Sequence, residues 1–364
     1  MVSSNRILII STDLPPIIGG ITKYVENIAL ALRDEYDIDF LGIPLDGNNI
    51  DPVFMQRDVN IIKLHKNKLF EVFQMHSCFK KLALEKYHRI ILANTLPDLF
   101  IVNPLLKRYK EKVYFLHYNN KQLLGRKKSF RHAIRDFHNI CISDWLTSEF
   151  RDRGISNVET LYPMLDTKEF LAIKPKAIKE LTKLTGFKLL TVSRIVPHKG
   201  HRDVISALES LDIAVEFIIA GSGSYLNELK SFAAGSPISE RIHFTGRVDA
   251  NELVWLYGNC DLFIMTSRNM PANIEGFGYS FIEANLHKKA VIGTDVGGIP
   301  SAVKDGVSGI LLPEGNIERL ADTIRQLYLD ADLRHQLGLQ GYERACKKFD
   351  IHSGHSTVRQ VFGL

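Results

Sequence analysis

The sequence lacks an apolar run long enough to cross a membrane, and it has few cysteines. A spanning helix needs about 20 consecutive apolar residues, whereas the run Ile7–Ile10 is followed at once by polar residues. We interpret this run as a first strand and expect neither a secretory leader nor an integral membrane protein. Zinc sites and disulfide frameworks usually show close cysteine spacings. The widely separated cysteines therefore favour reduced, structural thiols in a cytoplasmic protein; they are Cys78, Cys141, Cys260 and Cys346.

Two cofactor signals are incomplete. The glycine-containing segments Asp13–Ile21 and Gly221–Leu226 both lack the third glycine of the dinucleotide-binding fingerprint, so we expect no nicotinamide cofactor. The D-x-D spacings of Asp37–Asp39 and Asp330–Asp332 fall at a strand start and between helices, and we expect no metal ion there. The sequence therefore predicts no bound cofactor.

What the chain does have is the composition of a globular protein with a large core. It contains 364 residues, of which 45% are hydrophobic and 24% are charged. This length suits two α/β domains better than one. Short apolar runs alternate with helical patterns, which is typical of parallel sheets covered by helices. The alternation restarts after a polar, proline-bearing stretch at Lys174–Lys176, which we interpret as a linker.

The expected elements follow from these runs. Strands are expected at Arg6–Ser11, Asp37–Leu41, Asn60–Leu64, Arg89–Ala93, Lys112–His117 and Asn139–Ser143, and then at Lys188–Val192, Val215–Ala220, Arg241–Phe244, Leu262–Met265, Ala290–Gly293 and Gly309–Leu312. Helices are expected at Thr22–Leu32, Phe70–Lys86, Trp145–Arg153, His201–Leu208, Glu252–Tyr257, Ser280–Asn285, Glu318–Leu327 and Ala331–Lys348. Ligands of such sheets bind beyond the carboxyl ends of the strands.

Two cations stand five residues apart in the loop after the strand Lys188–Val192. Arg194 and Lys199 could together neutralise a diphosphate, because a guanidinium fork and an ammonium group suit two neighbouring phosphoryl groups. An exposed loop with two ordinary surface charges is the alternative.

The strongest signal is a pair of glutamates, Glu275 and Glu283, that brackets a glycine-rich segment. Eight residues along one helix would turn the two side chains about 80° apart, so they could share a ligand only if Glu275 lies in a loop. Gly276 and Gly278 favour that placement. Glu275 would then face sugar hydroxyls, the first helical turn would offer N–H groups to a phosphate, and Glu283 would reach a ribose diol. A helix-start glutamate plus an exposed helical glutamate is the alternative.

A third, weaker signal is the pair Gly19 and Gly20 between the first strand and its helix. Two glycines there let backbone N–H groups approach an anion closely. A turn that needs a positive φ explains them equally well.

In this order, the motifs resemble glycosyltransferase family 4, which comprises retaining enzymes of the GT-B fold that use sugar nucleotides. The matching stretches are Pro16–Gly20, Ser193-Arg194 with Lys199-Gly200, Ala220–Gly223, Phe244–Arg247, Glu275–Glu283, Gly297–Pro300, Asp305-Gly306 through Gly309–Leu311, and Phe349-Asp350. The sequence departs from the family pattern at Pro163-Met164, Lys289-Ala290 and Ser301, none of which is a predicted catalytic position.

The resemblance implies an α/β fold with two Rossmann-like parallel-sheet domains that face a central cleft, and a C-terminal helix that packs back on the N-terminal domain. We place an acceptor-binding domain at 1–168, a sugar-nucleotide-binding domain at 169–348, and the returning segment at 349–364. The resemblance also implies site residues. The catalytic set is His117, Arg194, Lys199 and Glu275, and the donor-binding set is Gly19, Gly20, Gly221, Gly223, Arg247, Val248, Gly276, Phe277, Gly278, Tyr279, Ser280 and Glu283. For His117, a satisfied histidine at a strand end is the alternative.

The implied reaction is metal-independent transfer of a hexose, with retention, from GDP-mannose or a UDP-hexose to a lipid-linked or polysaccharide acceptor. Polysaccharide or lipopolysaccharide assembly at the cell surface is the setting that this predicts. A retaining glycosidase uses two carboxylates, but neither Asp13 nor Asp144 is a convincing partner for Glu275. The resemblance implies instead that leaving group and acceptor meet on the same face of the sugar and that a donor phosphate oxygen takes the acceptor proton. A non-hydrolysing sugar-nucleotide epimerase and a sugar-nucleotide-binding regulator are the other interpretations.

The uneven distribution of basic residues along the chain suggests a partner for its N-terminal half. The net charge is only +5, but basic residues greatly outnumber acidic ones between Lys63 and Arg135. Region 121–135 mixes basic and apolar residues, as an element that touches anionic lipid on the inner face of the cytoplasmic membrane would. A solvated basic loop is the alternative. No nucleic-acid motif accompanies these charges, and we expect no nucleic acid partner.

Overall fold

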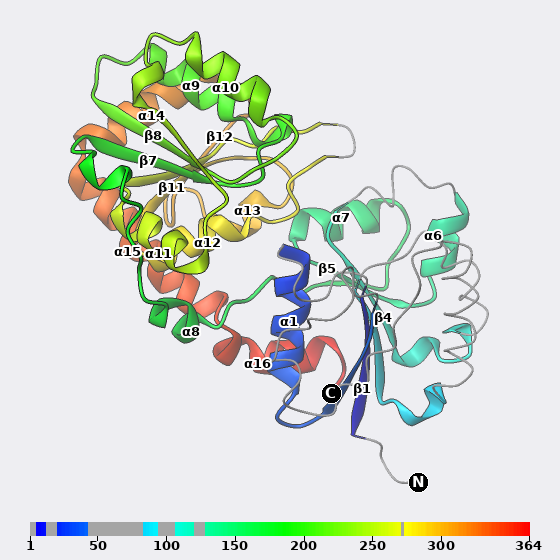
Figure 1. Cartoon of the computed structure of the whole chain (residues 1–364). Coiled ribbons are helices and arrows are strands. Elements are labelled where there is room, and N and C mark those ends of the chain that lie inside the picture. Colours follow the sequence, from blue (N-terminus) through cyan, green and yellow to red (C-terminus); the bar gives the residue numbers. More distant parts are fainter. Residues whose placement is uncertain (1–4, 12–19, 43–82, 94–105, 120–127, 271–272) are drawn as a thin grey trace. The chain divides into compact units, whose positions relative to one another are not determined.

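The computed structural model describes residues 5–11, 20–42, 83–93, 106–119, 128–270 and 273–364. The chain forms two compact units (Figure 1). Unit 1 comprises Met1–Met164 and Gly354–Leu364, and unit 2 comprises Leu165–Ser353. Within the described ranges, each unit contains a six-stranded sheet in which every pair of neighbouring strands is parallel. The predicted fold class is confirmed in this respect.

The sheet of unit 1 has the strand order β2-β1-β3-β4-β5-β6. Its strands are β1 (Arg6–Ser11), β2 (Asp37–Gly42), β3 (Arg89–Leu92), β4 (Val113–His117), β5 (His138–Cys141) and β6 (Val158–Thr160). Its described helices are α1 (Gly20–Leu32), α6 (Lys128–Ile134) and α7 (Asp144–Asp152). Ile7, Leu8 and Ile9 in β1 are all at most 1% exposed, so both faces of this strand are covered. That burial explains why the strand reads as a continuous apolar run and not as an alternating one.

The last helix, α16 (Ile351–Val361), packs its end on unit 1. Beyond it, the Phe362 ring meets Tyr114 of β4 edge to face at 5.1 Å. Arg89 Nε donates to the Phe362 carbonyl oxygen at 2.5 Å, and Arg359 pairs with Glu35 at 2.9 Å. The predicted return of the C-terminal helix to the N-terminal domain is thus confirmed.

The sheet of unit 2 has the strand order β12-β11-β10-β7-β8-β9. Its strands are β7 (Phe187–Val192), β8 (Val215–Ala220), β9 (Ile242–Gly246), β10 (Leu262–Met265), β11 (Ala290–Thr294) and β12 (Ile310–Leu312). Its helices are α8 (Thr167–Ala172), α9 (His201–Glu209), α10 (Leu226–Ala234), α11 (Ala250–Asn259), α12 (Tyr279–Leu286), α13 (Ile299–Ala302), α14 (Ile317–Leu329) and α15 (Ala331–Lys348). Counted from β7, this is the 3-2-1-4-5-6 order of a Rossmann sheet. The direction of strand addition reverses between β7 and β10, and such a switch point is where these sheets bind ligands.

Several predicted elements differ from the structure. Strand β6 and helices α6, α8, α10 and α13 were not predicted. The stretch Lys174–Lys176, which the sequence suggested as a linker, lies inside unit 2. Lys176 is held there by two carboxylates, Asp249 at 3.1 Å and Glu252 at 2.8 Å.

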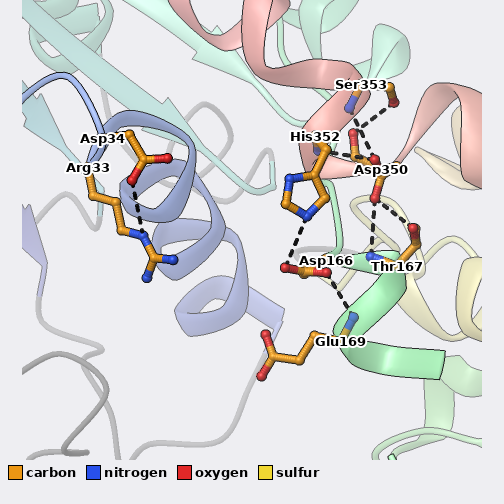
Figure 2. A network of polar contacts seen from close by, with 8 residues as sticks. All are labelled: Arg33, Asp34, Asp166, Thr167, Glu169, Asp350, His352 and Ser353. Atoms are coloured by element: carbon orange, nitrogen blue, oxygen red, sulfur yellow. Dashed lines mark hydrogen bonds and ion pairs between the residues drawn. The ribbon is translucent and has the colours of Figure 1, made fainter. Parts of the chain in front are cut away.

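A polar network joins the two segments in which the chain passes from one unit to the other (Figure 2). Asp350 Oδ1 accepts hydrogen bonds from the backbone N and the hydroxyl of Thr167, and its Oδ2 accepts from the backbone N atoms of His352 and Ser353. Asp166 accepts from Glu169 N and pairs with His352 Nε2 at 3.3 Å. These bonds keep residues 165–167 and 350–353 together in unit 2. The chain passes between the units after Met164 and after Ser353, whereas the sequence-based boundaries follow residues 168 and 348.

Some sequence predictions lie outside the described residues. These are the strand Asn60–Leu64, most of the helix Phe70–Lys86, Cys78, Gly19 with most of the Asp13–Ile21 loop, and the first part of region 121–135. In the ranges that the structure does describe, no helix combines the length and the apolar character needed to span a bilayer.

Candidate functional site

The candidate site of unit 2 is built on the two loops that leave the switch point of the sheet. The loop after β7 carries Arg194 and then a short 3-10 turn, η4 (Pro197–Lys199), before α9. The loop after β10 carries Glu275 and ends at Gly278, where α12 begins. Glu275 therefore lies in a loop, as the spacing of the two glutamates predicted.

Lys199 and Glu275 meet directly across this point. Lys199 Nζ donates to Glu275 Oε2 and also lies 3.6 Å from the sulfur of Met265, the last residue of β10. The two side chains are 10% and 14% exposed, so their charges face each other with little water between them. The structure thus brings together one predicted cation and one predicted acid at the expected edge of the sheet.

The electrostatic surroundings keep Glu275 ionised. Burial by itself raises the pKa of this carboxyl, but the charge of Lys199 and its hydrogen bond oppose that effect. The charges of His198 and Arg194 act in the same direction, and the net pKa of Glu275 is lowered. The Arg194 side chain is exposed, and its charge is nevertheless felt by Glu275. At neutral pH, Glu275 is therefore an acceptor of hydrogen bonds and not a proton donor.

Two of the predicted glycines are required because the loops after β7 and β8 touch. A Cβ on Gly221, whose φ is +137°, would lie 1.9 Å from the carbonyl oxygen of Ser193. A Cβ on Gly223 would lie 2.1 Å from the carbonyl oxygen of Ile195. Backbone hydrogen bonds join the same loops, such as Ile195 N to Ser222 O at 2.9 Å. The glycines therefore place the Arg194 loop against its neighbour.

Helices α9 and α12 both begin behind glycines in the left-handed conformation. Gly200 has φ +72° and Gly278 has φ +95°. Since glycine has no side chain, neither residue can cap the first turn of its helix. Elsewhere Ser143, Asp249 and Asn316 cap α7, α11 and α14. The two helix starts at the switch point thus suit an anion supplied from outside the chain.

The remaining donor-binding candidates occupy the same edge of unit 2. Gly276 and Phe277 lie in the Glu275 loop, and Tyr279 and Ser280 form the first turn of α12. Phe277 is 2% exposed and packs edge to face on Phe349 at 5.5 Å. Its side chain thus anchors the loop in the core, which leaves the backbone as the part that could meet a ligand.

Glu283 lies further along α12 and is 8% exposed. Tyr257 Oη donates to its Oε2 at 2.9 Å. Burial, followed by the charge of Glu283 and this hydrogen bond, raises the pKa of Tyr257 well above its usual value. Tyr257 is thus a protonated donor that fixes the rotamer of Glu283. The sequence did not reveal this partner, because a tyrosine at helical spacing on α11 reads simply as a core residue.

Arg247 and Val248 follow β9. Arg247 is exposed, and its Nε donates to Ser222 Oγ at 2.9 Å, which links the loops after β8 and β9. Val248 is half-buried beside it. Both residues directly follow the carboxyl end of β9, and a role in binding the nucleotide stays a prediction.

His117 and Gly20 belong to unit 1. Gly20 is the exposed first residue of α1, whereas His117 ends β4 and is only 1% exposed. The Asn139 amide donates to three backbone carbonyl oxygens, so its Oδ1 accepts from His117 Nε2 at 2.9 Å. The imidazole also lies 4.4 Å from the Phe150 ring. This environment matches the satisfied strand-end histidine that the sequence left open, and a role beside a donor sugar stays a prediction.

The structure adds a histidine that was not predicted as a site residue. His201, the first residue of α9, is 2% exposed, and its Nε2 lies 3.0 Å from Ser193 Oγ. Burial, together with the charges of Lys199 and His198, lowers the pKa of His201 to about 4. His201 is therefore neutral at pH 7, and it joins the end of β7 to the start of α9. The only sequence signal was its place immediately after Lys199-Gly200.

Among the described residues, no group of three or more His, Cys, Asp or Glu side chains is arranged to hold a metal ion. Cys141, Cys260 and Cys346 are free thiols. Burial raises the pKa of Cys260 to about 12, so this thiol stays protonated and acts as a core residue.

This chain is similar to known proteins in both its sequence and its fold. The sequence model of the family described as glycosyl transferases group 1 matches residues 173–344, which cover most of unit 2. A GDP-mannose-dependent α-(1-6)-phosphatidylinositol monomannoside mannosyltransferase of Mycobacterium tuberculosis is 31% identical over 197 residues, or 52% of this chain and 51% of that protein. The match thus spans about half the length of this relative.

Other similarities extend over nearly the whole chain. A GDP-mannose-dependent mannosyltransferase of Corynebacterium glutamicum, named as acting on a monoacylated phosphatidylinositol monomannoside, is 22% identical over 94% of this chain and 93% of its own. The structure of Anabaena HepE with UDP and glucose superposes with a TM-score of 0.79 at 19% identity, covering 98% of this chain and 99% of that one. Sucrose-phosphate synthase of Thermosynechococcus elongatus has the same TM-score at 18% identity, covering 98% of both chains.

At these identities the structures establish the fold alone, and the family model matches just under half of the chain. The two parallel sheets, the motif order and the group 1 match agree with each other. The chain therefore has the GT-B fold, and its unit 2 is similar in sequence to the glycosyl transferases group 1.

Proposed function

We propose that this protein is a retaining, metal-independent hexosyltransferase. It would move a hexose from a nucleoside diphosphate sugar to a lipid-linked or polysaccharide acceptor. The observation that carries the proposal is the ion pair of Lys199 and Glu275 at the switch point of the unit 2 sheet. Arg194 adds a second positive charge that acts on the same carboxylate.

The proposed roles follow from the charged groups that the protein already holds at this edge of the sheet before the donor binds. Arg194 and Lys199 would neutralise the diphosphate, and the helix starts behind Gly200 and Gly278 would give it N–H donors. Glu275, kept ionised, would accept hydrogen bonds from hydroxyls of the transferred sugar. Lys199 and Glu275 are held in place by their ion pair, so these two groups need little reorganisation as charge develops on the leaving group.

In the proposed step, the bond from the anomeric carbon to the diphosphate oxygen breaks. The acceptor oxygen forms the new bond on the same face of the sugar. The acceptor proton passes to an oxygen of the departing phosphate, which has gained negative charge. The protein supplies positioning and charge stabilisation, and the carboxylate of Glu275 takes no part in proton transfer.

For the donor, the similar proteins give two different indications. The mycobacterial and corynebacterial relatives are named for GDP-mannose, and HepE was solved with UDP and glucose. We favour GDP-mannose, because the sequence matches are the stronger of the two. The same relatives act on phosphatidylinositol mannosides by name, which supports a lipid-linked acceptor in our proposal.

A panel of GDP-, UDP- and ADP-sugars, each with and without a lipid-linked acceptor, tests the proposal. We expect one donor to raise the unfolding temperature and to be hydrolysed slowly, and we expect EDTA to change neither effect. Lys199→Ala, Arg194→Ala and Glu275→Gln should each lower turnover by about 10²–10³-fold. Lys176→Ala is the matched control, because Lys176 also pairs with carboxylates of unit 2, but these stand at the start of α11 and not in the loops after β7 and β10. Near-normal turnover in Lys199→Ala and Glu275→Gln would contradict the site.

The same panel separates the other functions. Conversion of the donor sugar without any acceptor would identify an epimerase. Tight binding of a sugar nucleotide without hydrolysis or transfer would identify a regulator.

We also propose peripheral contact with anionic lipid on the cytoplasmic side of the membrane, through the basic region 121–135. Of this region the structure describes residues 128–135, which include α6. Sedimentation with vesicles of phosphatidylglycerol and phosphatidylcholine at low salt tests the idea, and high salt should release the protein. No sedimentation with the anionic vesicles at low salt would dismiss this contact.

A further inference from the structure

The two loops of the candidate site are joined by a second ion pair that no motif indicated. Arg268 Nε lies 2.7 Å from Asp203 Oδ2, and its terminal nitrogen NH2 lies 2.5 Å from Asp203 Oδ1. The contact therefore has the two-point geometry of a guanidinium on a carboxylate, which fixes orientation as well as distance. The Asp203 side chain is 9% exposed, and that of Arg268 is 45% exposed.

Asp203 and Arg268 belong to the two segments that carry the candidate site residues. Asp203 stands in the first turn of α9, four residues after Lys199. Arg268 stands three residues after the end of β10, on the way to Glu275. The ion pair thus connects the helix that follows the Lys199 turn with the start of the loop that carries Glu275.

Two further bonds join the same segments. Arg268 N donates to the carbonyl oxygen of His198 at 2.8 Å, and Thr266 Oγ1 donates to the carbonyl oxygen of Gly200 at 2.9 Å. The carbonyl groups on either side of Lys199 are therefore bonded to residues on either side of Ser267. With the Asp203 contact, three connections fix the Lys199 turn against the exit of β10.

The rest of the Glu275 loop is held separately. Asn269 N donates to Glu314 Oε2 at 2.6 Å, and Gly298 N donates to the Glu275 carbonyl oxygen at 2.8 Å. The loop is thus anchored at its start and at its end. The Arg268 side chain is one part of this anchoring that a single substitution can remove without touching Lys199 or Glu275.

Charge gives the pair a second effect. Asp203 lies near the start of α9, where the helix dipole favours a negative group. Left alone, its carboxylate would also repel an anion bound at that helix start. Arg268 neutralises Asp203 and so removes the repulsion, while the carboxylate keeps its favourable place on the helix.

We propose that Asp203 and Arg268 are positioning residues that hold Lys199 and Glu275 in register for the reaction. The proposal rests on the function proposed above. It predicts that loss of the pair acts on turnover more than on folding, because an error of about 1 Å in the placement of reacting groups can cost about 10²-fold in rate.

The test compares Arg268→Gln with a matched control, Arg325→Gln. Arg325 pairs with Asp322 on α14, and its side chain is also 45% exposed. We expect kcat of Arg268→Gln to fall at least tenfold with KM for the donor changed less than threefold, and both constants of Arg325→Gln to be unchanged. Arg268→Lys should recover only part of kcat, since an ammonium group cannot reproduce the two-point contact. A purely structural role would instead lower the unfolding temperature without changing kcat of the folded protein.

A second measurement does not depend on any activity. Hydrogen–deuterium exchange of peptides covering 197–201 and 266–276 should be faster in Arg268→Gln than in Arg325→Gln or the unaltered protein. Unchanged exchange in both peptides, or an unchanged kcat, overturns the proposal. If the unaltered protein transfers no sugar from any donor, the function proposed above fails, and the exchange comparison still decides whether the pair holds the two loops together.

Discussion

Lys199 and Glu275 stand 76 residues apart in the sequence and form an ion pair in the fold. Neither side chain is more than 14% exposed. Parallel strands β7 and β10 are neighbours in the sheet, and their carboxyl ends therefore deliver the two residues to the same edge.

The buried ion pair should show strong coupling in a double-mutant cycle. Lys199→Met or Glu275→Gln alone leaves one buried charge without its partner, which should cost about 3 kcal/mol of unfolding free energy. The double variant should cost clearly less than the sum of the two, because it leaves neither charge behind. Urea unfolding followed by circular dichroism measures all four proteins. Additive losses would show that the two groups do not interact in solution.

His201 should make the protein less stable in mild acid. Its folded pKa of about 4 lies below the value of about 6.5 in the unfolded chain, so the unfolded state binds the proton more tightly. The stability is complete above pH 6.5 and is lost as the pH falls from 6.5 to 4, by up to about 3 kcal/mol. His201→Gln removes this titration, so its unfolding free energy should fall less steeply over the same range. Parallel curves for the two proteins would mean that the imidazole is not buried in neutral form.

Two glycines with nearly the same backbone angle separate conformational strain from steric clash. Gly200 has φ +72° and a Cβ there would lie 1.8 Å from the carbonyl oxygen of Thr266. Gly246 has φ +73°, and a Cβ there would meet no described atom within 4 Å. Gly246→Ala should therefore cost about 1 kcal/mol from the left-handed conformation alone. Gly200→Ala should cost about 2–4 kcal/mol, since β10 must also move. Equal losses in urea unfolding would contradict the close approach of the two loops.

Asp350 should be a stability residue of unit 2 because its carboxylate accepts four hydrogen bonds (Figure 2). Asp350→Ala removes all of them at a site that is 7% exposed and should cost about 2–4 kcal/mol. Asp34→Ala is the control, since the Asp34 side chain is 78% exposed and lies 3.9 Å from Arg33. Thermal unfolding compares the two variants. A loss in Asp350→Ala no larger than that of the control would show that the network adds no stability.

The regular elements were largely readable from the sequence where burial is continuous. The strands Arg6–Ser11, Val215–Ala220 and Leu262–Met265 and the helix Ala331–Lys348 occur at the predicted residues. Strands covered on both faces have uninterrupted apolar runs, and long helices repeat their apolar positions often enough to be recognised. The short helices α8 and α13, by contrast, have six and four residues, too few to show a period.

The same contrast applies to the candidate site. Local pattern and motif order were enough to predict the two sheets, the glycines at the loop contacts, and the placement of Lys199 and Glu275 in loops, whereas the pairing of β7 with β10 that makes these loops neighbours came from the tertiary structure. Only the tertiary structure decided the partners: Tyr257 for Glu283, Asn139 for His117, and Asp203 for Arg268. Each of these partnerships depends on where two distant segments pack against each other, and a hydrogen bond or an ion pair of this kind leaves no periodic trace in the sequence.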